Sequence, residues 1–159
     1  MRKENAEIDR IDRKIIKALQ DNARLSSQEL SDQVGISPSP CWRRVKALEE
    51  SGVISKYVTL VDPEALGLSI SIFTSVSLDK QIETALETFQ KAVRKRPEVM
   101  ECYLMTGDFD YLLRVVVGSL QDYERFLLDH LTKIPGVASI KSSFALKQVK
   151  YTTALPISG

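Results

Sequence analysis

Cationic, hydroxyl and aromatic side chains crowd into residues 37–46 of this sequence, SPSPCWRRVK. Arginine and lysine bind acidic groups, and serine hydroxyls donate to phosphate oxygens. At helical spacing Cys41, Val45 and Leu48 share one face, while Arg43 and Lys46 lie on the opposite one. One face is therefore suited to packing and the other to an acidic partner. The candidate residues for contact with this partner are Ser37, Ser39, Trp42, Arg43, Arg44 and Lys46.

Two predicted helices and a tight turn position these side chains. Ser26 and Glu29 stand at capping-box spacing, so a helix is expected to start near residue 27. Gly35 favours its end, and Ser37 followed by Pro38 favours the start of the next helix, which ends at residue 52. The pair is typical of a helix-turn-helix that enters the DNA major groove. An ordinary helical hairpin with a solvated basic face remains the alternative.

A second candidate site is the segment TGDFD, residues 106–110. A zwitterion needs an acceptor for its ammonium group and donors for its carboxylate. Asp108 or Asp110 can accept, and the N–H groups of the turn can donate. A hairpin turn whose aspartates cap their own backbone is the alternative.

The periodicity of the chain changes at Leu68, which divides it into two predicted domains. Helices are expected over 8–21, 27–34 and 38–52, followed by a short strand or wing over 53–60. Alternating patterns then predict strands over 68–78, 99–105, 111–117 and 139–147, with helices over 82–93 and 120–134. The fold class is α+β: a winged helix-turn-helix domain (1–60), a linker (61–67) and a ferredoxin-like βαββαβ domain (68–159). The tail, VKYTTALPISG, could add an edge strand.

Composition narrows the class of protein. The formal net charge of +1 means that DNA affinity must come from local placement of charge. Two cysteines, no long apolar run and a polar N-terminus favour a cytoplasmic protein without a membrane span. A single histidine argues against a metal site, and no catalytic grouping or cofactor motif is present. An enzyme built on the second domain and a structural adaptor remain the competing classes.

A four-stranded sheet with both helices on one side leaves its other face open. The many apolar residues on the predicted strands indicate that this face meets a partner subunit. A two-fold homodimer would also match palindromic double-stranded DNA.

Taken together, the stretches IDRIDRKIIKALQDNARLSSQELSDQVGISPSPCWRRVKALEESGVI, GDFDYLLRV, IPGVASIKSSFALKQVK and YTTALPI resemble the Lrp/AsnC transcription factors. The resemblance implies homodimers that join into larger assemblies, often octamers, and an amino-acid effector bound between dimers. It also implies that the effector site includes Leu104, Met105, Thr106, Gly107, Asp108, Asp110 and, as a weaker candidate, Ser142.

Overall fold

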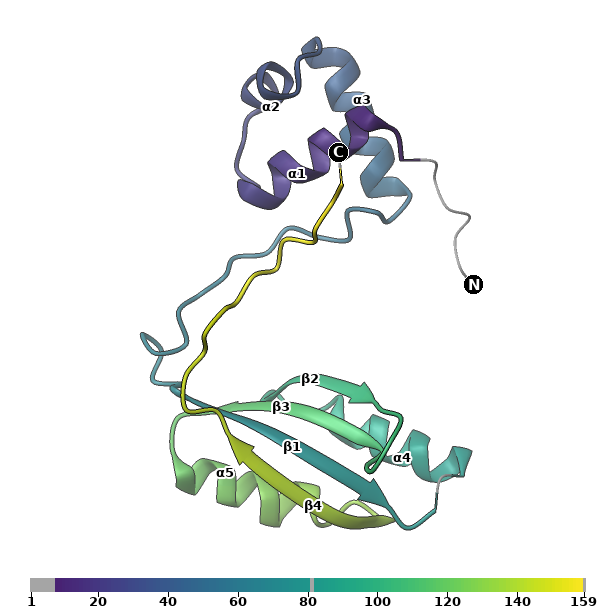
Figure 1. The fold of residues 1–159 in the computed structure, drawn as a ribbon, viewed down its shortest axis with the longest axis vertical. Coiled ribbons are helices and arrows are strands. Elements are labelled where there is room, and N and C mark those ends of the chain that lie inside the picture. The colour runs from purple at the N-terminus through teal and green to yellow at the C-terminus, as the bar shows by residue number, and fades with distance from the viewer. Residues whose placement is uncertain (1–7, 81, 159) are drawn as a thin grey trace. The chain divides into compact units, whose positions relative to one another are not determined.

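The computed structural model describes residues 8–80 and 82–158, which divide into two compact units (Figure 1). The first comprises residues 8–60 together with 150–158, and the second comprises residues 61–80 and 82–149. The division between the two units falls after residue 60, and residues 150–158 group with the first unit and not with the sheet.

Helices α1 (Arg10–Asp21), α2 (Ser27–Val34) and α3 (Pro38–Glu50) form the first unit. Asp9 and Asp12 make a reciprocal capping box at the start of α1, and Ser26 and Glu29 make another at the start of α2. Gly35 ends α2 with a φ of 81°, which glycine adopts without strain. The core of the unit consists of Ile15, Ala18, Leu30, Val34, Cys41 and Leu48. The predicted helix-turn-helix is therefore confirmed.

The strand predicted over 53–60 is not found, because none of these residues forms a strand. The tail likewise adds no edge strand, since residues 145–158 contain none. A strand needs a neighbour to accept and donate its ladder of hydrogen bonds, and alternating apolar residues cannot supply one.

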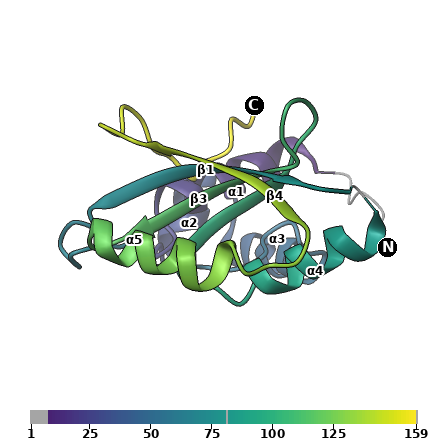
Figure 2. The same cartoon turned by 90° about the horizontal axis from the view of Figure 1, so that it is seen from below.

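The second unit contains β1 (Ile70–Leu78), α4 (Glu83–Val93), β2 (Val99–Leu104), β3 (Tyr111–Val117), α5 (Leu120–Phe126) and β4 (Val137–Phe144). Helix α5 continues as a π-helical turn, η1 (Leu127–Leu131). The strands form an antiparallel sheet in the order β2-β3-β1-β4, and both helices cover one of its faces (Figure 2). This is the predicted βαββαβ arrangement.

The covered face of the sheet supplies the core of the second unit. Ile72, Thr74 and Val76 of β1 are fully buried, and Phe89 of α4 stacks on Tyr111 of β3 with ring centroids 4.4 Å apart. The other face exposes Phe73 and Tyr103. In the described part of the chain, none of the helices has the length and apolar character needed to cross a bilayer.

Candidate functional site

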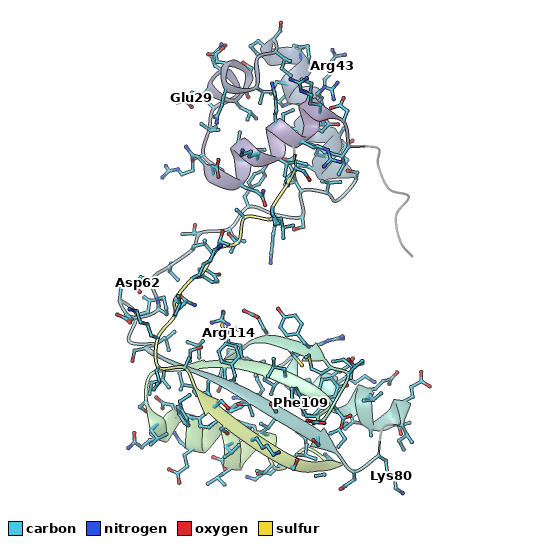
Figure 3. All side chains as sticks on the ribbon, viewed as in Figure 1. Glu29, Arg43, Asp62, Lys80, Phe109 and Arg114 are labelled. Atoms are coloured by element: carbon cyan, nitrogen blue, oxygen red, sulfur yellow. The ribbon has the colours of Figure 1, made fainter. Side chains whose placement is uncertain are left out.

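The outward face of α3 carries most of the predicted DNA-contacting side chains. Ser39, Arg43 and Lys46 are exposed, and Figure 3 labels Arg43 on this helix. Trp42 is 54% exposed, and the Lys46 Nζ atom lies 5.1 Å from the centroid of its ring. The ring and the ammonium group therefore hold each other in place beside Arg43.

The start of α3 offers hydroxyl groups where most helices offer backbone amides. Ser37 is the N-cap residue, but its side chain makes no capping hydrogen bond. Pro38 and Pro40 lack N–H groups, and the Cys41 N–H already donates to the Ser37 carbonyl oxygen at 3.1 Å. A phosphate here would meet the Ser39 N–H and the hydroxyls of Ser37 and Ser39.

Arg44 lies differently from the other predicted contacts. Its Nη1 atom is 2.7 Å from Asp9 Oδ2 and 2.8 Å from Asp12 Oδ1. These ion pairs join α3 to the capping box of α1. Hydrogen bonds from the Asp12 N–H and from Arg44 lower the pKa of the Asp9 carboxyl, while the two carboxylates raise the pKa of Arg44. The geometry thus gives Arg44 a role in holding α3 against α1.

The other candidate site is the turn between β2 and β3. Gly107 has a φ of 121°, and the Met105 N–H donates to the Asp110 carbonyl oxygen at 2.8 Å. Thr106, Gly107 and Asp108 are exposed, while the neighbouring Leu104 and Met105 are 60% and 37% exposed. Phe109, which Figure 3 labels, belongs to the same turn. A small ligand bound here would need a second surface to cover it.

The two aspartates of this turn have different surroundings. Asp110 is 6% exposed, and its Oδ2 atom accepts a hydrogen bond from the Leu78 N–H at 2.7 Å. Its own N–H donates to the Val76 carbonyl oxygen at 2.9 Å, which ties the turn to β1. Asp108 is exposed, and no hydrogen bond to its carboxylate is found among the described residues. Asp108 is therefore the better placed acceptor for an ammonium group.

Ser142 is not brought close to the turn within one chain. Ser142 belongs to β4, where it pairs with Thr74 of β1. Strand β4 forms the opposite edge of the sheet from β2. Its hydroxyl lies 2.5 Å from the Tyr123 hydroxyl, which is 2.9 Å from Thr74 Oγ1. This chain of hydroxyls joins β4, α5 and β1.

Sequence reasoning missed both the Arg44 ion pairs and the hydroxyl chain. Thr74 offered a signal, because it is a polar residue in the apolar register of β1. The Arg44 ion pairs offered no such signal, because Asp9 and Asp12 lie more than thirty positions away in the sequence. Among the described residues, no group of three His, Cys, Asp or Glu side chains could hold a metal ion.

Comparisons with known protein families agree with both units. Residues 8–55 match a winged helix-turn-helix DNA-binding domain, and residues 71–155 match the Lrp/AsnC ligand binding domain. This chain belongs to the Lrp/AsnC family. It is a DNA-binding transcriptional regulator with a ligand-binding domain, so the prediction that it is not an enzyme is confirmed.

Several family members are similar over almost their whole length. The Bkd operon transcriptional regulator of Pseudomonas aeruginosa is 50% identical over 152 residues, covering 96% of this chain and 99% of that protein. The leucine-responsive regulatory protein of Escherichia coli is 39% identical over 151 residues, covering 95% and 92%. A transcriptional regulator from Neisseria meningitidis, solved in complex with L-methionine, has a TM-score of 0.89 at 43% identity, covering 93% and 96%.

Proposed function

We propose that this family member binds double-stranded DNA as a homodimer through α3, and that an amino acid bound at the β2–β3 turn controls the binding. The exposed face of α3 carries the first part of the proposal. Arg43 and Lys46 supply positive charge there, beside the Ser37 and Ser39 hydroxyls. The overall charge of +1 cannot provide this affinity, so it depends on these few groups.

Within this proposal the residues of α3 have separate roles. Arg43, Lys46 and Trp42 contact the DNA, and the two serines hold phosphate oxygens. Arg44 acts as a positioning residue, because its guanidinium group is already held by Asp9 and Asp12. A change at Arg44 is then expected to alter the orientation of α3 in its unit. A change at Arg43 is expected to remove a contact with the DNA itself.

The effector proposal depends on the β2–β3 turn and its apolar neighbours. Asp108 accepts the ammonium group, turn N–H groups hold the carboxylate, and Leu104 and Met105 cover the side chain of the ligand. Because all of these residues are exposed in one chain, the missing wall of the site comes from another subunit. Leucine and methionine are the first effectors to test, since two relatives are described with these amino acids.

A dimer is supported by the open face of the sheet. Phe73 is 40% and Tyr103 54% exposed there, beside an Arg114–Glu101 ion pair of 2.8 Å. Dimers then join into a larger assembly, for which we propose an octamer acting in the cytoplasm. In such an assembly the effector sites lie between dimers, which links ligand binding to assembly.

One experiment tests both halves of the proposal. Genomic DNA fragments selected by the wild-type protein are titrated by fluorescence anisotropy, with and without each of the twenty amino acids. We expect sequence-specific binding whose affinity is changed by one or a few amino acids, and sedimentation analysis to report a change in assembly with the same ligands. Binding that is equally strong for all DNA sequences and unaffected by any amino acid would contradict the proposal.

A further inference from the structure

The segment 153–158 lies against α1 in the first unit. We define the strap as residues 153–158, which follow the extended segment after β4. The strap forms one wall of a groove of about 800 Å³, whose other walls are α1 and the segment 53–60. Apolar residues of the groove include Ile16, Leu19, Val53, Tyr57 and Val58.

Gln20 of α1 holds the backbone of the strap at two points. Its Oε1 atom accepts the Leu155 N–H at 2.6 Å, and its Nε2 atom donates to the Leu155 carbonyl oxygen at 3.2 Å. A side-chain amide that pairs with both groups of one residue acts as a neighbouring strand would. Arg13, nearly two turns earlier on α1, donates to the Ser158 carbonyl oxygen at 3.3 Å.

The packing of the strap is sparse. The Leu155 side chain is 73% exposed, and only Ala154 and Ile157 are half-buried. A segment with few buried contacts and a handful of exposed hydrogen bonds opens at low cost. The strap is therefore suited to a reversible attachment.

The route of the chain gives this attachment a consequence. The polypeptide passes between the two units twice, once after residue 60 and again before residue 150. The second passage starts at β4, which holds Ser142, and ends at Gln20 on α1. Helix α1 is in turn joined to α3 by the ion pairs of Arg44 with Asp9 and Asp12.

We propose that the strap is a two-state coupling element, docked on Gln20 in one state and released in the other, that conveys effector binding to the DNA-binding unit. This inference rests on the proposed function, since it needs an effector at the second unit. The two states differ in whether α1 is tied to β4. A ligand that favours one arrangement of the second unit thereby shifts the equilibrium between the docked and released states, and so acts on the DNA-binding unit.

The test compares Gln20→Ala with Gln28→Ala in the full-length chain. Gln28 is a matched control, because it is a glutamine of the same unit whose Nε2 atom donates to Asp32, four residues further along the same helix, at 2.9 Å. Hydrogen exchange at the C-terminal peptide reports docking, calorimetry with L-leucine and L-methionine reports effector binding, and anisotropy reports DNA affinity with and without each amino acid.

For Gln20→Ala we expect exchange of the C-terminal peptide about tenfold faster than in the wild type. The affinity for the amino acid should stay within about twofold, while the effector-induced change in DNA affinity shrinks by at least about fivefold. Gln28→Ala should match the wild type in all three measurements. Ile157→Asp, which places a charge at a half-buried strap position, should reproduce Gln20→Ala.

Three results would overturn the proposal. In the first, Gln20→Ala speeds exchange but keeps the full effector-induced change, so that docking has no part in the response. In the second, neither Gln20→Ala nor Ile157→Asp changes the exchange, so that these contacts do not hold the strap. In the third, wild-type DNA affinity ignores the amino acids. That result needs no variant protein, and it would contradict the proposed function as well as the role of the strap.

Discussion

Replacing Asp110 by alanine tests whether the two aspartates of the β2–β3 turn have different roles. The Asp110 carboxylate is buried and accepts the Leu78 N–H at 2.7 Å. Hydrogen bonds to charged groups contribute about 1.5–3 kcal/mol, and the alanine variant also leaves the buried Leu78 N–H without its acceptor. We therefore expect the free energy of unfolding of the second unit to fall by about 2 kcal/mol or more.

The assay has to separate the two units. The single tryptophan, Trp42, lies in the first unit, so its fluorescence does not report on the sheet. Hydrogen exchange measured along β1 and β3 at increasing urea concentration gives the free energy of opening of the second unit. In Asp110→Ala these strands should exchange faster, while α1, α2 and α3 keep their wild-type protection.

Asp108→Ala is the matched variant in the same turn. Because Asp108 is exposed, its replacement should change stability by no more than about 0.5 kcal/mol. Loss of a charge-assisted contact to the ammonium group should instead lower the affinity for the effector about 10- to 100-fold, as measured by calorimetry. The reasoning is refuted if Asp110→Ala is as stable as the wild type, or if Asp108→Ala binds the effector unchanged.

The remaining predictions concern other parts of the chain. Arg43→Ala should fold normally but lose about 1–3 kcal/mol of specific DNA binding, or lower the salt slope by about one if the contact is to phosphate; unchanged affinity and slope in anisotropy titrations would remove it from the interface. The folded-state pKa of Asp9 lies below 3.8, so the stability it contributes is present above pH 3.8 and is lost as the pH falls through the lower folded value. Acid titration followed by Trp42 fluorescence should place this loss at higher pH in Arg44→Gln, and identical titrations would show that the ion pairs do not stabilise the unit. Burial raises the pKa of the Cys41 thiol, so mass spectrometry after brief alkylation at neutral pH should find it unmodified in native protein and modified in denatured protein; rapid native labelling would instead favour a redox-sensing role. At Gly107 a Cβ atom would meet nothing within 4 Å, so both Ala and Val substitutions should cost about 1–3 kcal/mol through the positive φ alone, and a neutral alanine variant in thermal unfolding would contradict this.

Local chemistry allowed much of the fold to be predicted. The period-2 run of β3 predicted Tyr111–Val117, and the structure has the same bounds. Ser26, Glu29 and Gly35 predicted both ends of α2, because caps and a positive φ are properties of a few neighbouring residues. The order of strands and helices then left few topologies open, and the ferredoxin-like one was found.

The features that could not be predicted depend on partners far along the chain. Arg44 meets carboxylates more than thirty positions earlier, and Leu155 meets an amide 135 residues away. The segment 53–60 has a strand-like pattern, but the described residues of its unit contain no strand that could complete a ladder. Periodicity shows which side of a helix or strand is apolar. It does not show which distant group will form a hydrogen bond or ion pair with a polar side chain.

Two pairs of like residues differ in their contacts although their residue types are the same. Arg43 and Arg44 are adjacent on one helix, and Asp108 and Asp110 lie in one turn, so residue type alone predicts the same chemistry for both members of each pair. In each pair one member already has a partner: Asp9 and Asp12 bind Arg44, and the Leu78 N–H donates to Asp110. A side chain that already neutralises a partner must lose that contact before it can bind DNA or ligand, which raises the cost of using it. Among the described residues, Arg43 and the Asp108 carboxylate have no such partner. They are therefore the groups through which this regulator is expected to contact its ligands, and their neighbours Arg44 and Asp110 keep them in place.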